Sequence, residues 1–227
     1  MLPSLLRPRC AVLGGGGHAK VVVEVLQSQR KYRPIAITDR RAGSWTVLGV
    51  PVVGDESLIP ELVKCGIRWY VVGVGGVPDN RPRSLLYLKG REAGLRPLIA
   101  IHRSATVARS SEIGPGTVVM PGAVLNPGCR LGANVIANTG SIVEHDARIG
   151  DHVHLCPRAT LSGGVEIGVG AFVGAGAVVR EGLRVGPWAV VGAGAVVIRD
   201  VPANGRVAGV PARPLAKPSR RTPVARA

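Results

Sequence analysis

The chain has 227 residues, enough for one large domain or two small ones, and its 32 glycines and 18 prolines leave little room for long regular helices. Hydrophobic residues make up 46% of it, which excludes a disordered chain, although aromatic residues reach only 3%. The formal net charge of +15 fits nucleic acid, acidic small ligands such as phosphorylated cofactors, or simply an arginine-rich composition. The scarcity of stacking aromatics argues against nucleic acid, and we expect no such partner.

Membrane and redox signals are weak in this sequence. It contains no run of about 18 apolar residues, and residues 1–9 lack an apolar stretch of signal-peptide length. We therefore expect a cytoplasmic protein with no membrane partner. The four cysteines form no C-x-x-C pair, which argues against a zinc site or a disulfide framework, and we interpret them as reduced packing residues.

Residues 9–101 alternate between strand and helix patterns, which predicts a parallel α/β unit. The expected strands are 10–13, 35–38, 69–74 and 98–101, and the expected helices surround Val22–Leu26 and Arg83–Glu92.

A glycine cluster follows the first expected strand and contains G-x-G-x-x-A as Gly14, Gly16 and Ala19. Glycines at this place let the backbone approach a diphosphate at a helix N-terminus, and Asp39, after the second strand, can bind a sugar or base hydroxyl. The unit is too small for a complete NAD-binding domain, so the pattern favours a sugar-nucleotide site. His18 either lines that site or caps the helix.

From residue 107 onward, the chain repeats every six residues. Fifteen of the sixteen positions reached from Val107 by steps of six are Val, Ile or Leu, and the sixteenth is Ala137. This period fits neither a helix nor a simple strand, but it fits a short strand plus a turn, with three such units closing one triangular coil. We therefore predict a β-helical prism. Its flat faces are expected to pair around a threefold axis, with the active site in a cleft between subunits.

The densest polar segment of the repeat runs from Asn138 to Asp146, followed by His152 and His154. His145 is suited to act as a general base near neutral pH, and the adjacent Asp146 can fix its tautomer and stabilise the imidazolium. Two other interpretations are a solvent-facing turn and a zinc site between subunits, as in some hexapeptide prisms. The spacing of the three histidines argues against zinc, and we expect no metal.

Taken together, these motifs resemble the sialic-acid O-acetyltransferase and bacillosamine N-acetyltransferase family of hexapeptide-repeat sugar acyltransferases, which includes enzymes acting on UDP-4-amino sugars and GDP-perosamine. The resemblance covers about residues 9–216. The motifs that carry it, in chain order, are Gly14–Ala19, Asp39, Ile101–Ala105, Asn138–Thr139, Val143–Asp146 and Gly209–Ala212.

The resemblance implies a fold and a domain organisation. A Rossmann-like sugar-nucleotide-binding domain would span residues 1–101, and a left-handed parallel β-helix, the acyltransferase domain, residues 102–212. Residues 213–227 would form a flexible basic tail, whose Arg213 and Lys217 could meet CoA phosphates. The protein would be a homotrimer.

The resemblance also implies site residues. His145 would be the general base and Asp146 the acid that raises its basicity. Asn138 would line the acetyl and sugar pocket. The nucleotide-sugar site would include Gly16, Gly17, His18, Asp39 and Arg40, and acetyl-CoA would contact His154, Gly163, Ala175 and Ala193. Arg40 stands where some relatives have an acid. A backbone N–H near residues 162–164 could hold the oxyanion.

The expected reaction is acetyl transfer from acetyl-CoA to the amine of a nucleotide-linked 4-amino-4,6-dideoxy sugar. The alternative within the family is O-acetylation of sialic acid or a related sugar. The alternatives from other classes are a non-catalytic scaffold or nucleotide-sensing protein and a prism-type zinc lyase.

Overall fold

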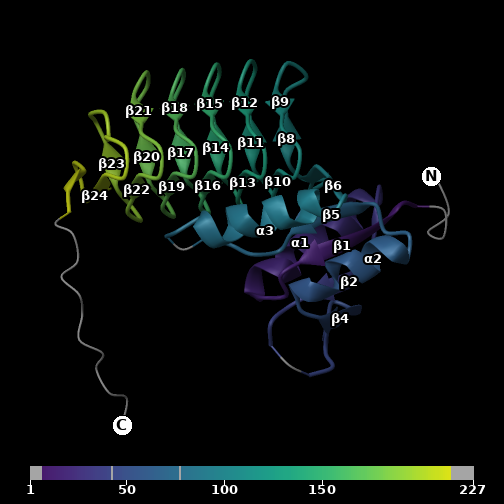
Figure 1. Ribbon diagram of the computed structural model, residues 1–227. Helices are drawn as coiled ribbons and strands as arrows, with labels where there is room; N and C mark the ends of the chain where they lie inside the picture. Colours follow the sequence, from purple (N-terminus) through teal and green to yellow (C-terminus); the bar gives the residue numbers. More distant parts are fainter. Residues whose placement is uncertain (1–6, 42, 77, 216–227) are drawn as a thin grey trace, which may run out of the picture.

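The computed structural model describes residues 7–41, 43–76 and 78–215. An N-terminal α/β unit lies against one side of a long prism of stacked coils (Figure 1). Strand β6 (Arg96–Pro97) completes the sheet of the N-terminal unit, and β7 (Ala100–Ile101) begins the first sheet of the prism. The single strand that we expected over 98–101 is therefore wrong, because these residues straddle the passage from one sheet to the other.

The N-terminal unit has one mostly parallel sheet in the order β3-β4-β2-β1-β5-β6, and only the β3–β4 hairpin is antiparallel. Leu48 and Gly49 form the turn of that hairpin with positive φ angles, as a two-residue turn between twisted strands requires. The other elements of this unit are β1 (Arg9–Leu13), α1 (Gly17–Gln29), β2 (Arg33–Thr38), β3 (Thr46–Val47), β4 (Val50–Gly54), the 3₁₀ helix η2 (Glu56–Leu58), α2 (Ile59–Lys64), β5 (Trp69–Val72) and α3 (Arg81–Glu92).

Apolar side chains cover both faces of this sheet. Val22, Val23 and Leu26 of α1 join one sheet face to Val118 and Ile136 of the prism in a single buried cluster. The opposite face is covered by side chains of α2 and α3. The N-terminal unit and the prism therefore share a hydrophobic core, which fixes their relative orientation.

The prism is a left-handed parallel β-helix made of three sheets whose strands have two residues each, except for the three-residue β24 in the last coil. Paired residues of successive regular coils lie 18 positions apart, as Val118 and Ile136 do. The domain face, which meets the N-terminal unit, consists of β7, β10 (Val118–Val119), β13 (Ile136–Ala137), β16 (His154–Leu155), β19 (Phe172–Val173), β22 (Val190–Val191) and β24 (Arg206–Ala208). The apolar face consists of β8 (Thr106–Val107), β11 (Val124–Leu125), β14 (Ile142–Val143), β17 (Thr160–Leu161), β20 (Val178–Val179) and β23 (Val196–Val197). The charged face consists of β9 (Glu112–Ile113), β12 (Arg130–Leu131), β15 (Arg148–Ile149), β18 (Glu166–Ile167) and β21 (Arg184–Val185).

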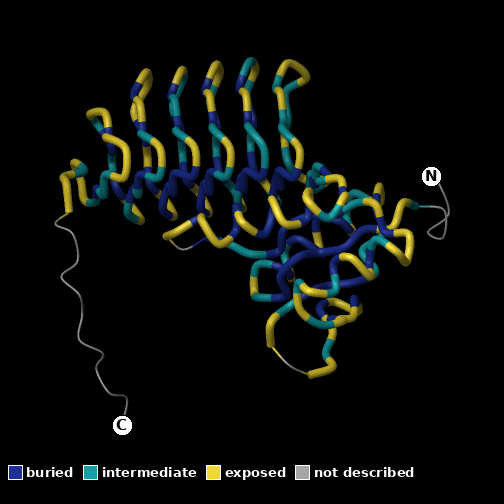
Figure 2. The backbone as a smooth tube through the Cα atoms, in the orientation of Figure 1, coloured by how far each residue is buried: buried dark blue, intermediate teal, exposed yellow. Residues whose placement is uncertain are grey.

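The second residue of each strand points into the prism, where the aliphatic positions of the sixfold repeat form one continuous core. Burial is concentrated inside the coils and where they meet the N-terminal unit, whereas their far tips are exposed (Figure 2). The first residue of each strand points outward and gives its face its character. On the charged face, Glu112 pairs with Arg130 at 3.4 Å and Glu166 with Arg184 at 3.1 Å.

Residues 200–214 close the last coil. Val201 bridges to Val185, the Ala212 amide donates to the Val196 carbonyl, and β25 (Arg213–Pro214) pairs antiparallel with β24. Arg213 and Pro214, which we had placed in the flexible tail, are thus a strand. The tail from residue 216 on, including Lys217, lies outside the described residues.

Candidate functional site

His145 and Asp146 lie in the turn that follows β14, on the edge between the apolar and charged faces. The His145 Nδ1 and the Asp146 Oδ2 are 2.9 Å apart. Because a carboxylate only accepts hydrogen bonds, Nδ1 carries the proton of the neutral ring, and Nε2 presents its lone pair outward. The His145 side chain is 64% exposed, so Nε2 is accessible to a substrate.

Gly163 lies one coil further along the same edge, directly against the imidazole. A Cβ at Gly163 would lie 2.6 Å from His145 Nε2, so only glycine leaves the ring in its present position. Of the three amides that we considered for an oxyanion, Ser162 donates to Val179 and Gly164 donates to the His145 carbonyl. The Gly163 amide has no such partner within the described part of the chain, and it is the one free to donate to a ligand.

Asn138 lies on a different edge, between the domain and apolar faces, and contacts His154. The His154 Nδ1 donates to the Gly76 carbonyl at 2.9 Å, so Nε2 is unprotonated and accepts from Asn138 Nδ2 at 3.1 Å. His154 is only 3% exposed, and this burial, reinforced by the nearby Arg83 cation, lowers its pKa to about 4. The His18 ring lies 6.2 Å from it, and burial lowers the pKa of His18 to about 3.

Ala175 and Ala193 are exposed on the same edge as Asn138, at successive coils, where the Ala175 carbonyl accepts from the Gly194 amide. Within one chain, the expected site residues of the prism are therefore divided between two edges. Asn138, Ala175 and Ala193 lie on one edge, and His145 lies on the other, with the apolar face between them.

Arg83 of α3 is a part of this region that sequence reasoning missed. It is 1% exposed and donates to the carbonyls of Asn134, His152 and Val153 at a corner of the prism. Burial without a carboxylate partner lowers its pKa to about 9. Its guanidinium fastens α3 to the coils and holds a positive charge close to His154.

His152 is only partly exposed and packs between the prism and α3. Its Nδ1 lies 2.9 Å from the Asn134 amide nitrogen, and its ring meets the edge of Tyr87. The described residues contain no group of three His, Cys, Asp or Glu side chains placed to hold a metal ion. The Cys156 thiol is buried, which raises its pKa to about 12 and makes it a poor nucleophile.

The glycine loop and Asp39 meet in the N-terminal unit. The Gly15 amide donates to Asp39 Oδ2 at 2.8 Å, and Arg41 Nε donates to Oδ1 at 2.8 Å. The Arg41 hydrogen bond is the main reason that the pKa of Asp39 falls to about 2. Arg41 also stacks on Trp45, 4.4 Å from the ring centroid. A Cβ at Gly16 or Gly17 would contact nothing, so the N-terminus of α1 is open to a ligand.

A cavity of about 450 Å³ adjoins this loop. Its polar lining comes from Asp39, Arg40, Glu56 and Lys89, and its apolar lining from Gly14, Val74, Pro82, Leu85 and Leu86. Of the polar lining residues, only Asp39 and Arg40 were candidates from sequence, because Glu56 and Lys89 reach the cavity from η2 and α3, far along the chain.

Comparison with known proteins agrees with this architecture. Residues 9–89 match the family model described as the PglD N-terminal domain. No curated protein sequence matches the chain.

Solved structures match along nearly the whole chain. PerB from Caulobacter crescentus, in complex with CoA and GDP-perosamine, is 42% identical with a TM-score of 0.86, over 91% of this chain and 97% of that one. The acetyltransferase domain of PglB from Neisseria gonorrhoeae, in complex with acetyl coenzyme A, is 38% identical with a TM-score of 0.84, over 92% and 100%. WeeI from Acinetobacter baumannii is 27% identical with a TM-score of 0.77, over 91% and 99%.

Proposed function

This chain belongs to the hexapeptide-repeat family of perosamine and bacillosamine N-acetyltransferases, and on that premise we propose that it acetylates the amino group of a nucleotide-linked 4-amino-4,6-dideoxy sugar. It is an acetyltransferase, with acetyl-CoA as the acyl donor. The observation that carries the proposal is the His145–Asp146 pair, whose Nε2 faces outward beside the free amide of Gly163.

The chemistry follows from these groups. His145 Nε2 accepts a proton from the sugar amine as the amine nitrogen attacks the thioester carbonyl, and Asp146 stabilises the imidazolium that forms. The Gly163 amide donates to the oxyanion of the tetrahedral intermediate. Collapse of the intermediate breaks the carbon–sulfur bond, and the imidazolium returns its proton to the CoA thiolate. Because the acetyl group passes directly to the amine, no cysteine nucleophile is needed.

A homotrimer would bring the two edges together. The outward residues of the apolar face form a ladder of small and branched side chains that one chain leaves partly uncovered: Thr106, Val124, Ile142, Thr160, Val178 and Val196. If three such faces surround a threefold axis, each contact is heterologous, so unlike edges of neighbouring subunits meet. His145 of one subunit then approaches the Asn138 edge of the next, beside its sugar-nucleotide domain.

The substrate roles assigned above to the glycine loop and Asp39 belong to the same proposal. Gly16, Gly17 and His18 stand at the open N-terminus of α1, where amides favour a diphosphate, and Asp39 borders the adjoining cavity. His154, Ala175 and Ala193 would meet acetyl-CoA along the Asn138 edge. No helix in the described ranges is long and apolar enough to cross a membrane.

The test is thiol release from acetyl-CoA with UDP- and GDP-linked 4-amino-4,6-dideoxy sugars and with free sialic acid. We expect release with a nucleotide-linked amino sugar, and a kcat that is about 10²–10⁴ lower in His145→Ala at an unchanged melting temperature. His102→Ala, which removes a side chain that hydrogen-bonds only to Ser104 in the described structure, is the matched control and should keep full activity. Release with sialic acid alone, or an intact rate in His145→Ala, would refute the proposal.

A further inference from the structure

The cavity beside the glycine loop contains a carboxylate that the acetyl transfer does not use. Glu56 begins η2, which is capped by Asp55 accepting from the Ser57 amide at 2.8 Å. This short helix directs the Glu56 side chain into the cavity wall, where it is 15% exposed. A carboxylate that is mostly sheltered from water, in a cavity whose lining is partly apolar, needs hydrogen-bond donors.

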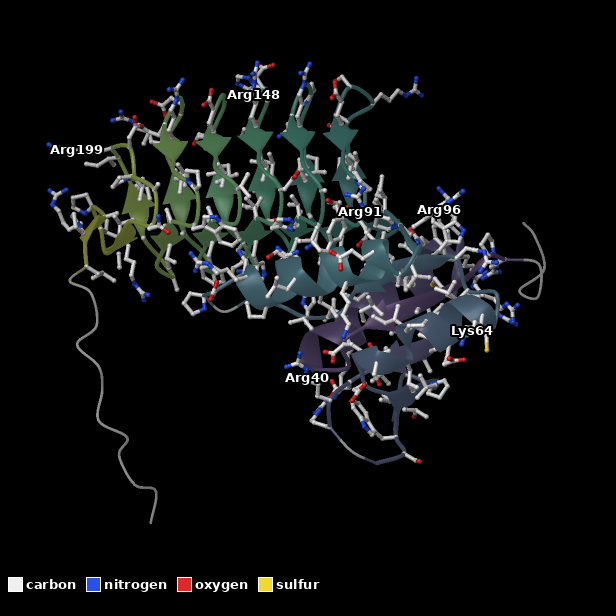
Figure 3. The ribbon with its side chains drawn as sticks, viewed as in Figure 1. Arg40, Lys64, Arg91, Arg96, Arg148 and Arg199 are labelled. Atoms are coloured by element: carbon white, nitrogen blue, oxygen red, sulfur yellow. The ribbon has the colours of Figure 1, made fainter. Side chains whose placement is uncertain are left out.

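The two carboxylates that line the cavity differ in their spare capacity. Asp39 already accepts from the Gly15 amide and from Arg41 at both of its oxygens. Glu56 has Arg40 as its partner, with Nε 3.1 Å from each oxygen, but Arg40 is 84% exposed and approaches from solvent (Figure 3). Since an ionised carboxylate offers about four acceptor sites, Glu56 can accept further donors from inside the cavity.

The remaining lining fits a flat aromatic ligand that carries both donors and acceptors. Val74, Pro82 and Leu86 supply apolar surface, and Leu85 of α3 is 65% exposed although it borders the cavity. Lys89, one turn further along α3, belongs to the same lining as Glu56 and carries a cationic side chain. The cavity therefore combines a hydrophobic slot with two carboxylates, of which Asp39 is already engaged by Gly15 and Arg41, and with the cationic residues Arg40 and Lys89.

Among the nucleobases, this combination matches guanine. Guanine has two adjacent donors, N1–H and the 2-amino group, that can face the two oxygens of one carboxylate, and beside them the O6 acceptor that an ammonium group can bind. Uracil has a single N–H between two carbonyl oxygens, which a carboxylate would repel. Adenine places a ring acceptor next to its amino group and meets the same repulsion.

We propose that this cavity binds guanine, with Glu56 accepting from N1–H and the 2-amino group and Lys89 donating to O6, so that the sugar substrate is carried by guanosine diphosphate. The inference rests on the proposed function for the sugar, but it concerns only the base. The cavity is continuous with Gly14, at the start of the loop that leads into the N-terminus of α1. A base in the cavity therefore places its diphosphate toward the amides of that helix.

The experiment is calorimetric titration of the full chain with GDP, IDP and UDP, without acetyl-CoA. We expect GDP to bind about ten- to hundredfold more tightly than UDP, and IDP, which lacks the 2-amino group, to fall between them. Glu56→Gln should weaken GDP by about tenfold or more and leave UDP unchanged. Glu61→Gln is the matched control, because Glu61 is exposed on α2 and pairs with Lys64 at 2.7 Å.

The outcomes separate the two proposals. UDP binding as tight as GDP binding, or an unchanged GDP-to-UDP ratio in Glu56→Gln, overturns the guanine assignment even if an amino sugar is acetylated. GDP binding that depends on Glu56 supports it even if no thiol is released, and in that case the proposed acetyl transfer is the part that fails. Binding of none of the three nucleotides overturns the guanine assignment.

Discussion

Lowering the pH should destabilise this fold through the buried His154. The ring is enclosed by His18 from α1, Arg83 from α3, Phe172 from β19 and Asn138, and its Nδ1 proton is held by the Gly76 carbonyl. If Nε2 were protonated, its proton would face the amide protons of Asn138 and lose their hydrogen bond. The ring would also carry a positive charge close to the buried guanidinium of Arg83. The folded state therefore excludes the proton that the unfolded chain accepts.

The size of the effect follows from the difference in pKa. The pKa of His154 is 6.5 in the unfolded reference and about 4 in the folded protein, so between these values the unfolded state binds more protons, and stability falls as the pH falls. The free energy of unfolding is therefore about 2 kcal/mol lower at pH 5 than at pH 7.5. The loss increases further between pH 5 and pH 4 and levels off below pH 4. The depressed pKa of His18 acts in the same direction.

The assay is urea denaturation at pH 7.5, 6 and 5, at one fixed protein concentration, for the wild type, His154→Gln and His102→Gln. Glutamine keeps an amide that can donate to Gly76 but cannot titrate, so His154→Gln should lose about 2 kcal/mol less than the wild type between pH 7.5 and 5. His102→Gln should follow the wild type. Equal losses in all three proteins would show that the burial of His154 does not set the acid sensitivity.

Two further predictions concern the prism. Gly163→Ala should displace the His145 ring, because the added Cβ would lie 2.6 Å from its Nε2, and should lower kcat about 10²-fold. The melting temperature should barely change, since the exposed ring can rotate away from the new methyl group. A wild-type kcat in this variant would show that the position of the ring is not critical. Ile142→Asp should place a charge in the middle of the apolar face and dissociate the proposed trimer in light scattering, whereas Arg148→Asp, in the same coil on the charged face, should not. An assembly that survives Ile142→Asp would place the interface elsewhere.

Most of the prism could be predicted from sequence because its period is strict. One aliphatic residue in every six points into the prism, and three six-residue units make one coil. The spacing alone therefore predicts paired strands 18 residues apart. The N-terminal unit was harder to predict. The β3–β4 hairpin, η2 and α2 were missed because strands of a few residues and a single helical turn carry no periodic signal.

The site divides in the same way. The contact between His145 and Asp146 joins adjacent residues, so it could be predicted from the sequence alone. Arg83 looks like an ordinary surface cation of a helix, and only the unpaired carbonyls at Asn134 and His152 make its burial favourable. Glu56 likewise gains meaning only when η2 and α3 meet around the cavity.

Residues 200–214, which close the last coil, also affect how readily the protein can self-associate. A parallel β-helix whose last coil is left open exposes unpaired amides and carbonyls along its terminal strands, and these can pair with strands of another molecule. Here Val201 covers the rim of the charged face, Ala212 covers that of the apolar face, and β25 covers that of the domain face. Pro214 in this outermost strand has no N–H that could donate a hydrogen bond to a strand of another molecule. The same fifteen residues that finish the fold thus also stop it from polymerising end to end into filaments.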